Sequence, residues 1–123
     1  MSGKSLKSKT GKRYELIYSI HLERPSRNQI YGLLLGGGYT GTTGNFWEPI
    51  FVTAIVPDSI AQFTYVTTTK GRQSIALGDE LLQVNDTNVY NLSRRDVLYM
   101  MQYPLGVNLK FGRKKELHRS ILI

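Results

Sequence analysis

The sequence predicts a mainly β fold of the α+β class, a partly open antiparallel sandwich or barrel of five to six strands capped by two α-helices. Segments rich in Tyr, Ile, Val and Leu recur between turn residues, as expected for strands. Helical patterns are confined to two segments, 58–66 and 93–102. A chain of 123 residues with no cysteine can form one hydrophobic core without a disulfide framework. Strands therefore dominate, and the helices must cover the open ends of a small sheet.

Three strands are expected in the first half of the chain. RYELIYSIHL (13–22) alternates and is rich in Tyr and Ile. After a turn that contains Pro25, IYGLLLG (30–36) predicts the second strand, and GGYTGTTGN (37–45) predicts a flexible connector. EPIFVTAIVP (48–57) predicts the third strand, which a proline ends.

The middle of the chain predicts a helix, a turn and a pair of strands. DSIAQFTYV (58–66) is a short helix whose N-cap is one of its first two residues. TTTKGRQSIAL (67–77) predicts a long turn, and GDELLQVNDTNVYNL (78–92) predicts two short strands about an Asn-Asp turn. We expect Asp79 to fix the strand-connecting turn rather than to bind a ligand.

The clearest helix is SRRDVLYMMQ (93–102). Ser93 is a good N-cap, Asp96 follows three residues later in a box-like start, and Pro104 stops the helix. GVNLKFGRK (106–114) then predicts the last strand.

The net charge of +7 is concentrated at the two ends of the chain. Residues 1–13 hold five bases and no acid, residues 113–123 hold four bases and one acid, and residues 14–112 are close to neutral. We expect a disordered basic N-terminal segment (1–13), one folded domain (14–112) and a C-terminal tail (113–123). Solvated tails are the favoured interpretation, with weak contact to anionic lipid as an alternative and no nucleic-acid partner. No signal peptide is visible, and no segment approaches the roughly 18 apolar residues of a membrane span.

Glycines crowd the segment IYGLLLGGGYTGTTGN (30–45). Gly36-x-Gly38-x-x-Gly41 fits the dinucleotide-binding fingerprint by its letters, but that motif must open a helix. The following TTGNFWEPIFV has no helical period, so this interpretation is rejected. A hairpin whose glycines adopt positive φ explains residues 36–44 and leaves residues 30–35 unexplained.

Those unexplained residues resemble a known family. Ile30-Tyr31-Gly32-Leu33, followed by LLGGG, resembles the X-Φ-Gly-Φ carboxylate-binding loop and second strand of PDZ domains. ALGDELLQVNDTNVYNLSRRDVLYMM (76–101) resembles the most diagnostic PDZ stretch, and EPIFVTAIVPDSIA resembles the third strand and first helix. The resemblance covers residues 14–112. It implies a non-catalytic module that binds the extreme C-terminal peptide of a partner as a strand added between the second strand and the second helix.

The resemblance also implies a set of site residues. It assigns the ligand carboxylate to Ile30, Tyr31, Gly32 and Leu33, with Arg27 holding it through water, or Ser26 or Arg24 in that place. It assigns the peptide groove to Leu34, Leu35, Arg94, Leu98 and Met101. By the two-residue period of a strand, Leu33 and Leu35 should point to one side and Leu34 to the other.

The ligand class depends on Arg94, which stands where many PDZ domains have a histidine. An arginine offers a fork for a carboxylate or hydroxyl, and its stem can cover an apolar side chain. With Leu98 and Met101 beside it, ligands of the Φ-x-Φ-COOH type are favoured, and an acidic residue at the minus-two position is the second choice. The alternative is that Arg94 points to water.

The chain itself ends in HRSILI, a Φ-x-Φ sequence formed by Ile121, Leu122 and Ile123. The hypothesis is head-to-tail self-association, in which residues 118–123 dock into the groove of a neighbouring molecule. A frayed end is the equally weighted alternative.

We expect neither catalysis nor a cofactor or metal. His21 and His118 are the only histidines and lie far apart in the sequence, so a nucleophile–base pair has little support. The expected partners are C-terminal tails of receptors, channels or adhesion proteins. The expected location is cytoplasmic, at the inner face of the plasma membrane or at junctions, within a larger scaffold that serves signalling or cell polarity.

Overall fold

The computed structural model describes residues 14–38, 48–90 and 92–115. Their elements are, in order, β1 (Tyr14–Glu23), β2 (Leu33–Gly37), β3 (Ile50–Ile55), α1 (Ile60–Phe63), β4 (Tyr65–Thr68), β5 (Gly71–Ser74), β6 (Glu80–Val84), β7 (Thr87–Asn88), α2 (Arg94–Gln102) and β8 (Gly106–Lys114). None of the helices in these segments is long and apolar enough to cross a membrane.

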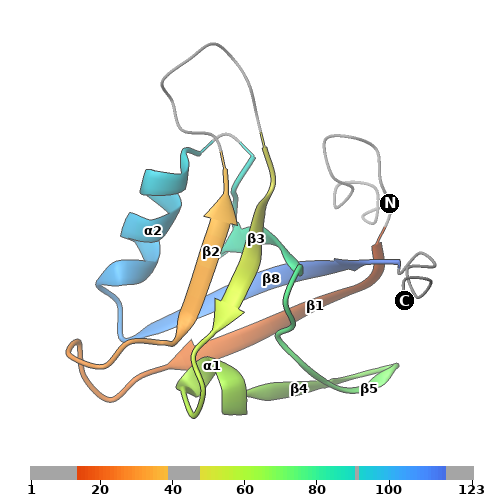
Figure 1. Ribbon diagram of the computed structural model, residues 1–123, viewed down its shortest axis with the longest axis horizontal. Coiled ribbons are helices and arrows are strands. Elements are labelled where there is room, and N and C mark those ends of the chain that lie inside the picture. The colour runs from red at the N-terminus through yellow and green to blue at the C-terminus, as the bar shows by residue number, and fades with distance from the viewer. Residues whose placement is uncertain (1–13, 39–47, 91, 116–123) are drawn as a thin grey trace, which may run out of the picture.

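The main sheet has six strands, and its pairings are antiparallel. Its order is β1-β8-β6-β3-β2, with the short β7 paired to β6, while β4 and β5 form a separate two-stranded sheet. α2 lies beside β2, and α1 lies next to the start of β4 (Figure 1). The predicted fold class, a mainly β domain with an open antiparallel sheet and two helices, is confirmed. The edge position of β2 is the feature that matters for function.

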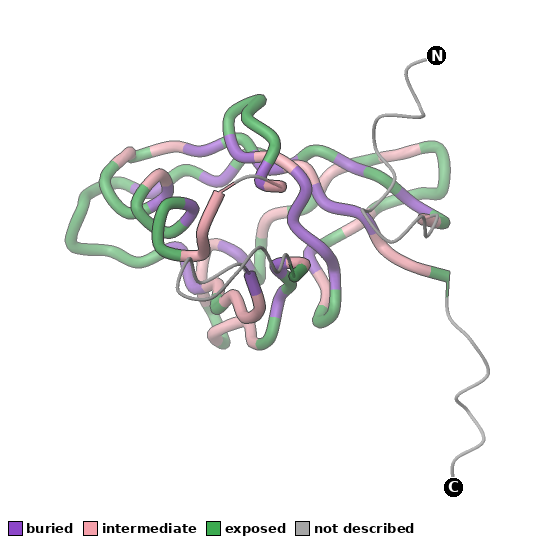
Figure 2. The backbone as a smooth tube through the Cα atoms, turned by 90° about the horizontal axis from the view of Figure 1, so that it is seen from above, coloured by how far each residue is buried: buried purple, intermediate pink, exposed green. Residues whose placement is uncertain are grey.

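The core follows from alternation along the strands. In β1, the buried Leu16, Tyr18, Ile20 and Leu22 alternate with exposed residues, because successive side chains of a strand point to opposite faces. Its neighbour β8 contributes the fully buried Phe111, which stacks on the Tyr18 ring at a centroid separation of 5.6 Å. Buried stretches of backbone run through the middle of the molecule, and exposed turns lie around them (Figure 2).

The long helix α2 begins and ends as its sequence predicts. The Ser93 hydroxyl accepts a hydrogen bond from the Asp96 amide at 3.1 Å, which satisfies one of the free amides at the helix start. Val97 is fully buried and Met101 nearly so, while Leu98 on the neighbouring stripe stays partly exposed. The apolar face of α2 is therefore shared between the core and the space next to β2.

A buried polar cluster holds the turn before β6. The Asp79 carboxylate accepts hydrogen bonds from the Tyr18 hydroxyl at 2.6 Å and the Ala76 amide at 3.0 Å. It also accepts from Nε and Nη2 of Arg113, each at 2.9 Å, in a bidentate pair. Burial first, and then the hydrogen bond to Asp79, raise the pKa of Tyr18. Asp79 thus fixes the turn, as predicted.

The prediction of a long turn over residues 67–77 is wrong. Residues of this segment belong to the hairpin β4–β5, and the predicted helix 58–66 ends at Phe63. The β-branched residues Val66, Thr67 and Thr68 favour a strand, and Gly71 supplies the positive φ of +100° after the turn. The predicted boundary between the helix 58–66 and the turn 67–77 falls inside β4, so its strand-forming residues were divided between two elements.

Candidate functional site

The open edge of β2 borders the candidate site. β2 pairs with β3 on one flank and has no strand on its other flank within the described part of the chain. Val56 donates its amide to the Gly32 carbonyl at 2.9 Å, and Gly38 donates its amide to Pro49 at 3.1 Å. In antiparallel pairing these bonds make Leu33–Ile55 and Gly37–Ile50 non-hydrogen-bonded pairs. The backbone amides and carbonyls of β2 that face away from β3 are therefore those of Leu33, Leu35 and Gly37.

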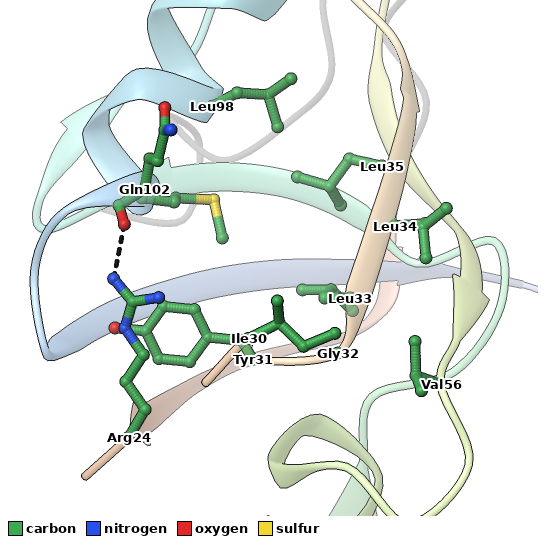
Figure 3. Close-up of a pocket in the computed structure, with 11 residues that line it drawn as sticks. Arg24, Ile30, Tyr31, Gly32, Leu33, Leu34, Leu35, Val56, Leu98 and Gln102 are labelled. Atoms are coloured by element: carbon green, nitrogen blue, oxygen red, sulfur yellow. Dashed lines mark hydrogen bonds between the residues drawn. The ribbon is translucent and has the colours of Figure 1, made fainter. Parts of the chain in front are cut away.

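The side chains of β2 alternate as predicted. Leu33 and Leu35 are half-buried and pack against the core, whereas Leu34 is 50% exposed. Leu33 and Leu35 point toward α2, and Leu34 points away from it (Figure 3). The register shifts between Leu34 and Leu35, where β3 carries the extra residue Thr53, whose hydroxyl donates to the Leu34 carbonyl.

A pocket of about 410 Å³ lies between β2 and α2. Among the described residues that line it, Arg24 alone is charged. The lining consists of Arg24, Ile30, Tyr31, Gly32, Leu33, Leu34, Leu35, Val56, Leu98, Met101 and Gln102. Its volume and its apolar walls with few polar groups are typical of a ligand site.

Most of the predicted site residues come together in this pocket. The loop and strand residues 30–35 line it, as do Leu98 and Met101 from α2. Val56 and Gln102 also line it and were not predicted. Gln102 could have been found, because it lies four residues after Leu98 and so shares its helix face. Val56, beyond the end of β3, gives no such signal.

The loop before β2 is shaped by Gly32. Its φ is +92°, in the left-handed region that favours glycine, and a Cβ added there would collide with the Ser59 side chain. Ser59 in turn caps α1. The carbonyls of Tyr31 and Gly32 accept from the amides of Ala61 and Val56. Within residues 14–38, 48–90 and 92–115 neither the Tyr31 nor the Gly32 amide donates a hydrogen bond, so the loop offers unused amides beside the pocket.

Arg24 ties this loop to the end of α2. It is buried, and it donates from Nε to Pro104 and from Nη1 to Gln29, each at 3.1 Å. Nη2 donates to the Gln102 carbonyl, the bond drawn in Figure 3. The guanidinium also lies 4.7 Å from the centre of the Tyr31 ring, a cation–π distance. Carbonyls at the negative end of a helix are favourable partners for this cation.

Tyr31 completes the same junction. Its hydroxyl donates to the Pro104 carbonyl at 2.7 Å, so the ring is held between the loop and the end of α2. Burial raises the pKa of Tyr31, and the Arg24 charge lowers it by less. The hydroxyl is therefore a stable hydrogen-bond donor at neutral pH.

The remaining predicted residues lie outside the pocket lining. Arg27 donates from Nε to the Tyr103 carbonyl at 2.9 Å and is exposed, so Arg24, the predicted alternative, is the base that lines the pocket. Arg94 lies at the other end of the groove, where its Cβ is close to Gly38. The predicted self-ligand, Ile121 to Ile123, lies outside the described residues.

The comparisons with known proteins identify the fold. No protein-family model matches the sequence, and no curated protein matches it. Among solved structures, the PDZ domain of a choanoflagellate GIPC bound to a GAIP peptide is 18% identical, with a TM-score of 0.58 over 82% of this chain and 94% of that one. The second PDZ domain of Dlg1 from the choanoflagellate Monosiga brevicollis is 22% identical, with a TM-score of 0.59 over 80% and 100%. The chain therefore has the PDZ fold.

Proposed function

We propose that this chain is a non-catalytic interaction module that binds the extreme C-terminal peptide of partner proteins by adding a strand to β2. The observation that carries this function is the open edge of β2, whose outward amides at Leu33 and Leu35 run along the apolar pocket. The peptide bound to the GIPC domain supports the same use of the fold here.

The free carboxylate of the peptide would lie at the end of the pocket formed by the loop that contains Gly32. The unused amides of Tyr31 and Gly32 and the outward amide of Leu33 supply donors there. Arg24 supplies a positive charge that is held in place by its three carbonyl partners. A backbone nest beside a fixed cation favours a ligand that ends in a free acid.

We propose a preference for Φ-x-Φ ends. The terminal side chain would enter the space between Leu33, Leu98 and Met101, and the side chain two residues earlier would lie near Leu35 on the same face. Burying one Ile contributes roughly 2–3 kcal/mol, whereas a micromolar ligand needs about 8 kcal/mol. Strand pairing and the carboxylate contacts must supply much of the remaining binding free energy.

The first test compares free and amidated peptides. Random C-terminal peptides are screened against the chain and against a variant that lacks residues 120–123, so that the chain's own end cannot compete. Selected peptides are then measured by calorimetry as free acids and as C-terminal amides. We expect enrichment of Φ-x-Φ ends and loss of binding on amidation, with little change at high salt. Amides that bind as well as acids would contradict the proposal.

A substitution on α2 tests the groove. Leu98 lines the pocket, so Leu98→Asp removes apolar contact and brings a negative charge close to the ligand carboxylate. We expect peptide affinity to fall by about 30-fold, which corresponds to roughly 2 kcal/mol. Tyr99→Asp is the matched control, because Tyr99 is the exposed next residue of α2 and lies outside the pocket lining. Peptides that still bind Leu98→Asp would show that the groove is assigned wrongly.

Partners and location form the broader part of the proposal. The ligands would be the C-terminal tails of receptors, channels or adhesion proteins, recognised by a scaffold at the inner face of the plasma membrane or at junctions. Head-to-tail docking of residues 118–123 predicts self-association that is lost when residues 120–123 are removed, as measured by gel filtration at high concentration. Vesicle binding that falls steeply with salt would instead favour the alternative, a lipid-surface adaptor that uses its basic tails.

A further inference from the structure

The open edge of β2 extends further than the pocket that borders it. β2 continues to Gly37, and the backbone of Gly37 faces away from β3 like that of Leu33 and Leu35. The pocket lining, however, stops at Leu35 on β2 and at Leu98 on α2. The residues beyond these two therefore determine how far along β2 a ligand strand can extend.

That space is closed by direct contact between Gly38 and the first residue of α2. A Cβ placed on Gly38 would lie 3.0 Å from the Arg94 Cβ, 3.0 Å from Cγ1 of Ile50 and 3.3 Å from its Cδ1. An added strand needs about 4.8 Å from β2 in the hydrogen-bonding direction, and its own side chains need further room. The contact leaves no such gap at this end of the groove.

The residues at the closed end of the groove are fixed by their backbone conformation, a hydrogen bond and a helix cap. Gly37 and Gly38 have φ values of +76° and +91°, so the chain turns at the end of β2 in a way that favours glycine. Gly38 is held by its bond to Pro49, and the buried Ile50 lies beneath it. On the other side Arg94 opens a helix that Ser93 caps. A side chain at position 38 would be strained by the positive φ and crowded by Arg94 and Ile50, so glycine suits this close approach.

We propose that the groove accepts only the last three residues of its ligand and that the ligand chain leaves the groove after the minus-two residue. This inference rests on the proposed function. The terminal residue pairs near Leu33 and the minus-two residue near Leu35, a span of about 7 Å at a rise of roughly 3.3 Å per residue. Residues further upstream meet the contact between Gly38 and Arg94 and turn toward solvent. Selectivity is therefore concentrated in the Φ-x-Φ end itself.

A length series tests this proposal. Acetylated peptides of three, five and eight residues share one Φ-x-Φ end with a free acid, and Gly and Ser occupy the added positions. We expect dissociation constants within about twofold of one another, because the added residues make no contact in the groove. An eight-residue peptide that binds tenfold more tightly than the three-residue peptide would overturn the inference and leave the proposed function intact. Failure of all three free acids to bind would overturn both.

Hydrogen exchange gives a second readout that needs no substitution. On saturation with the eight-residue peptide, the outward amides of Leu33 and Leu35 should exchange at least tenfold more slowly, because the ligand strand pairs with them. The Gly37 amide should exchange at an unchanged rate. Protection of Gly37 comparable to that of Leu35 would show that the strand continues past the closed end, which contradicts the proposal.

Discussion

Two arginines of this domain each lie against a tyrosine ring and beside a cavity, and they differ in the partner of their charge. Arg113 lies 5.6 Å from the Tyr18 ring centre, and Arg24 lies 4.7 Å from that of Tyr31. Each borders a cavity, of about 390 Å³ for Arg113 and about 410 Å³ for Arg24. Arg113 pairs with the buried Asp79. In the described part of the chain no carboxylate pairs with Arg24, which donates only to carbonyls.

The difference lies in the counter-charge, which Arg113 has inside the molecule and Arg24 lacks in the described part of the chain. The charge of Arg113 is neutralised inside the molecule, and the Asp79 hydrogen bond is the main cause of the raised pKa of Arg113. The carbonyls around Arg24 stabilise its charge through dipoles and leave its net charge in place. A carboxylate that enters the pocket beside β2 would supply the missing counter-charge. The comparison predicts that one arginine contributes chiefly to stability and the other to binding.

The largest effect is expected at Arg113. Arg113→Met leaves the Asp79 carboxylate buried with no counter-charge, and breaking such a pair costs about 3–5 kcal/mol. Urea unfolding monitored by circular dichroism should show this loss, while the folded fraction binds peptide with affinity within about twofold of wild type. A variant of unchanged stability, or one that is stable but does not bind, would remove the distinction between the two arginines.

Arg24→Met should affect binding more than Arg113→Met does. It removes the charge-assisted contact that the proposed function assigns to the ligand carboxylate; such a contact is worth about 1.5–3 kcal/mol, which corresponds to roughly a 10- to 150-fold loss of affinity. Calorimetry with a free-acid peptide measures the loss. The affinity of Arg24→Lys should lie between those of wild type and Arg24→Met, because lysine keeps the charge without the planar fork. An Arg24→Met variant that retains full affinity would show that the loop amides alone hold the carboxylate.

Tyr18, which lies next to Arg113, predicts that the stability of the fold depends on pH in the alkaline range. The folded pKa of Tyr18 is raised above its unfolded value of about 10, so the folded state keeps a proton that the unfolded state loses. Its contribution is therefore fully present below about pH 10 and is lost as the pH rises further, by roughly 1.4 kcal/mol per pH unit. Unfolding free energies between about pH 9.5 and 11 should fall less steeply for Tyr18→Phe than for wild type. Equal slopes would contradict the assignment.

Local patterns were sufficient to predict most of the fold, and the family resemblance supplied most of the residues that line the pocket. The capping Ser93 and the stop at Pro104 define α2, and alternation defines β1, because these signals lie within one element. The loop around Gly32 and the groove position of Leu98 were predicted from the resemblance to PDZ domains, which for these residues rests on two separate stretches of sequence, 30–38 and 76–101.

The position of Arg24 could not be predicted in the same way. Its acceptors are Gln29, Gln102 and Pro104, which lie 5, 78 and 80 residues away. Two of these contacts exist only once α2 has packed next to the loop, so no local pattern could choose between Arg24 and Arg27. The closed end of the groove has the same origin, because Gly38 and Arg94 meet only in the folded chain.

The smallest effect is expected at Arg27, the arginine that the resemblance first assigned to the ligand carboxylate. Arg27 is exposed and donates to the Tyr103 carbonyl at the surface. Surface substitutions of this kind usually change stability by less than about 0.5 kcal/mol. Arg27→Met should therefore change the unfolding free energy by less than about 0.5 kcal/mol and the peptide affinity by less than about twofold, measured beside Arg24→Met with the same peptide. An affinity loss at Arg27 as large as that at Arg24 would mean that the carboxylate is held from the exposed side of the loop, and the unpaired charge of Arg24 would then have no role in binding.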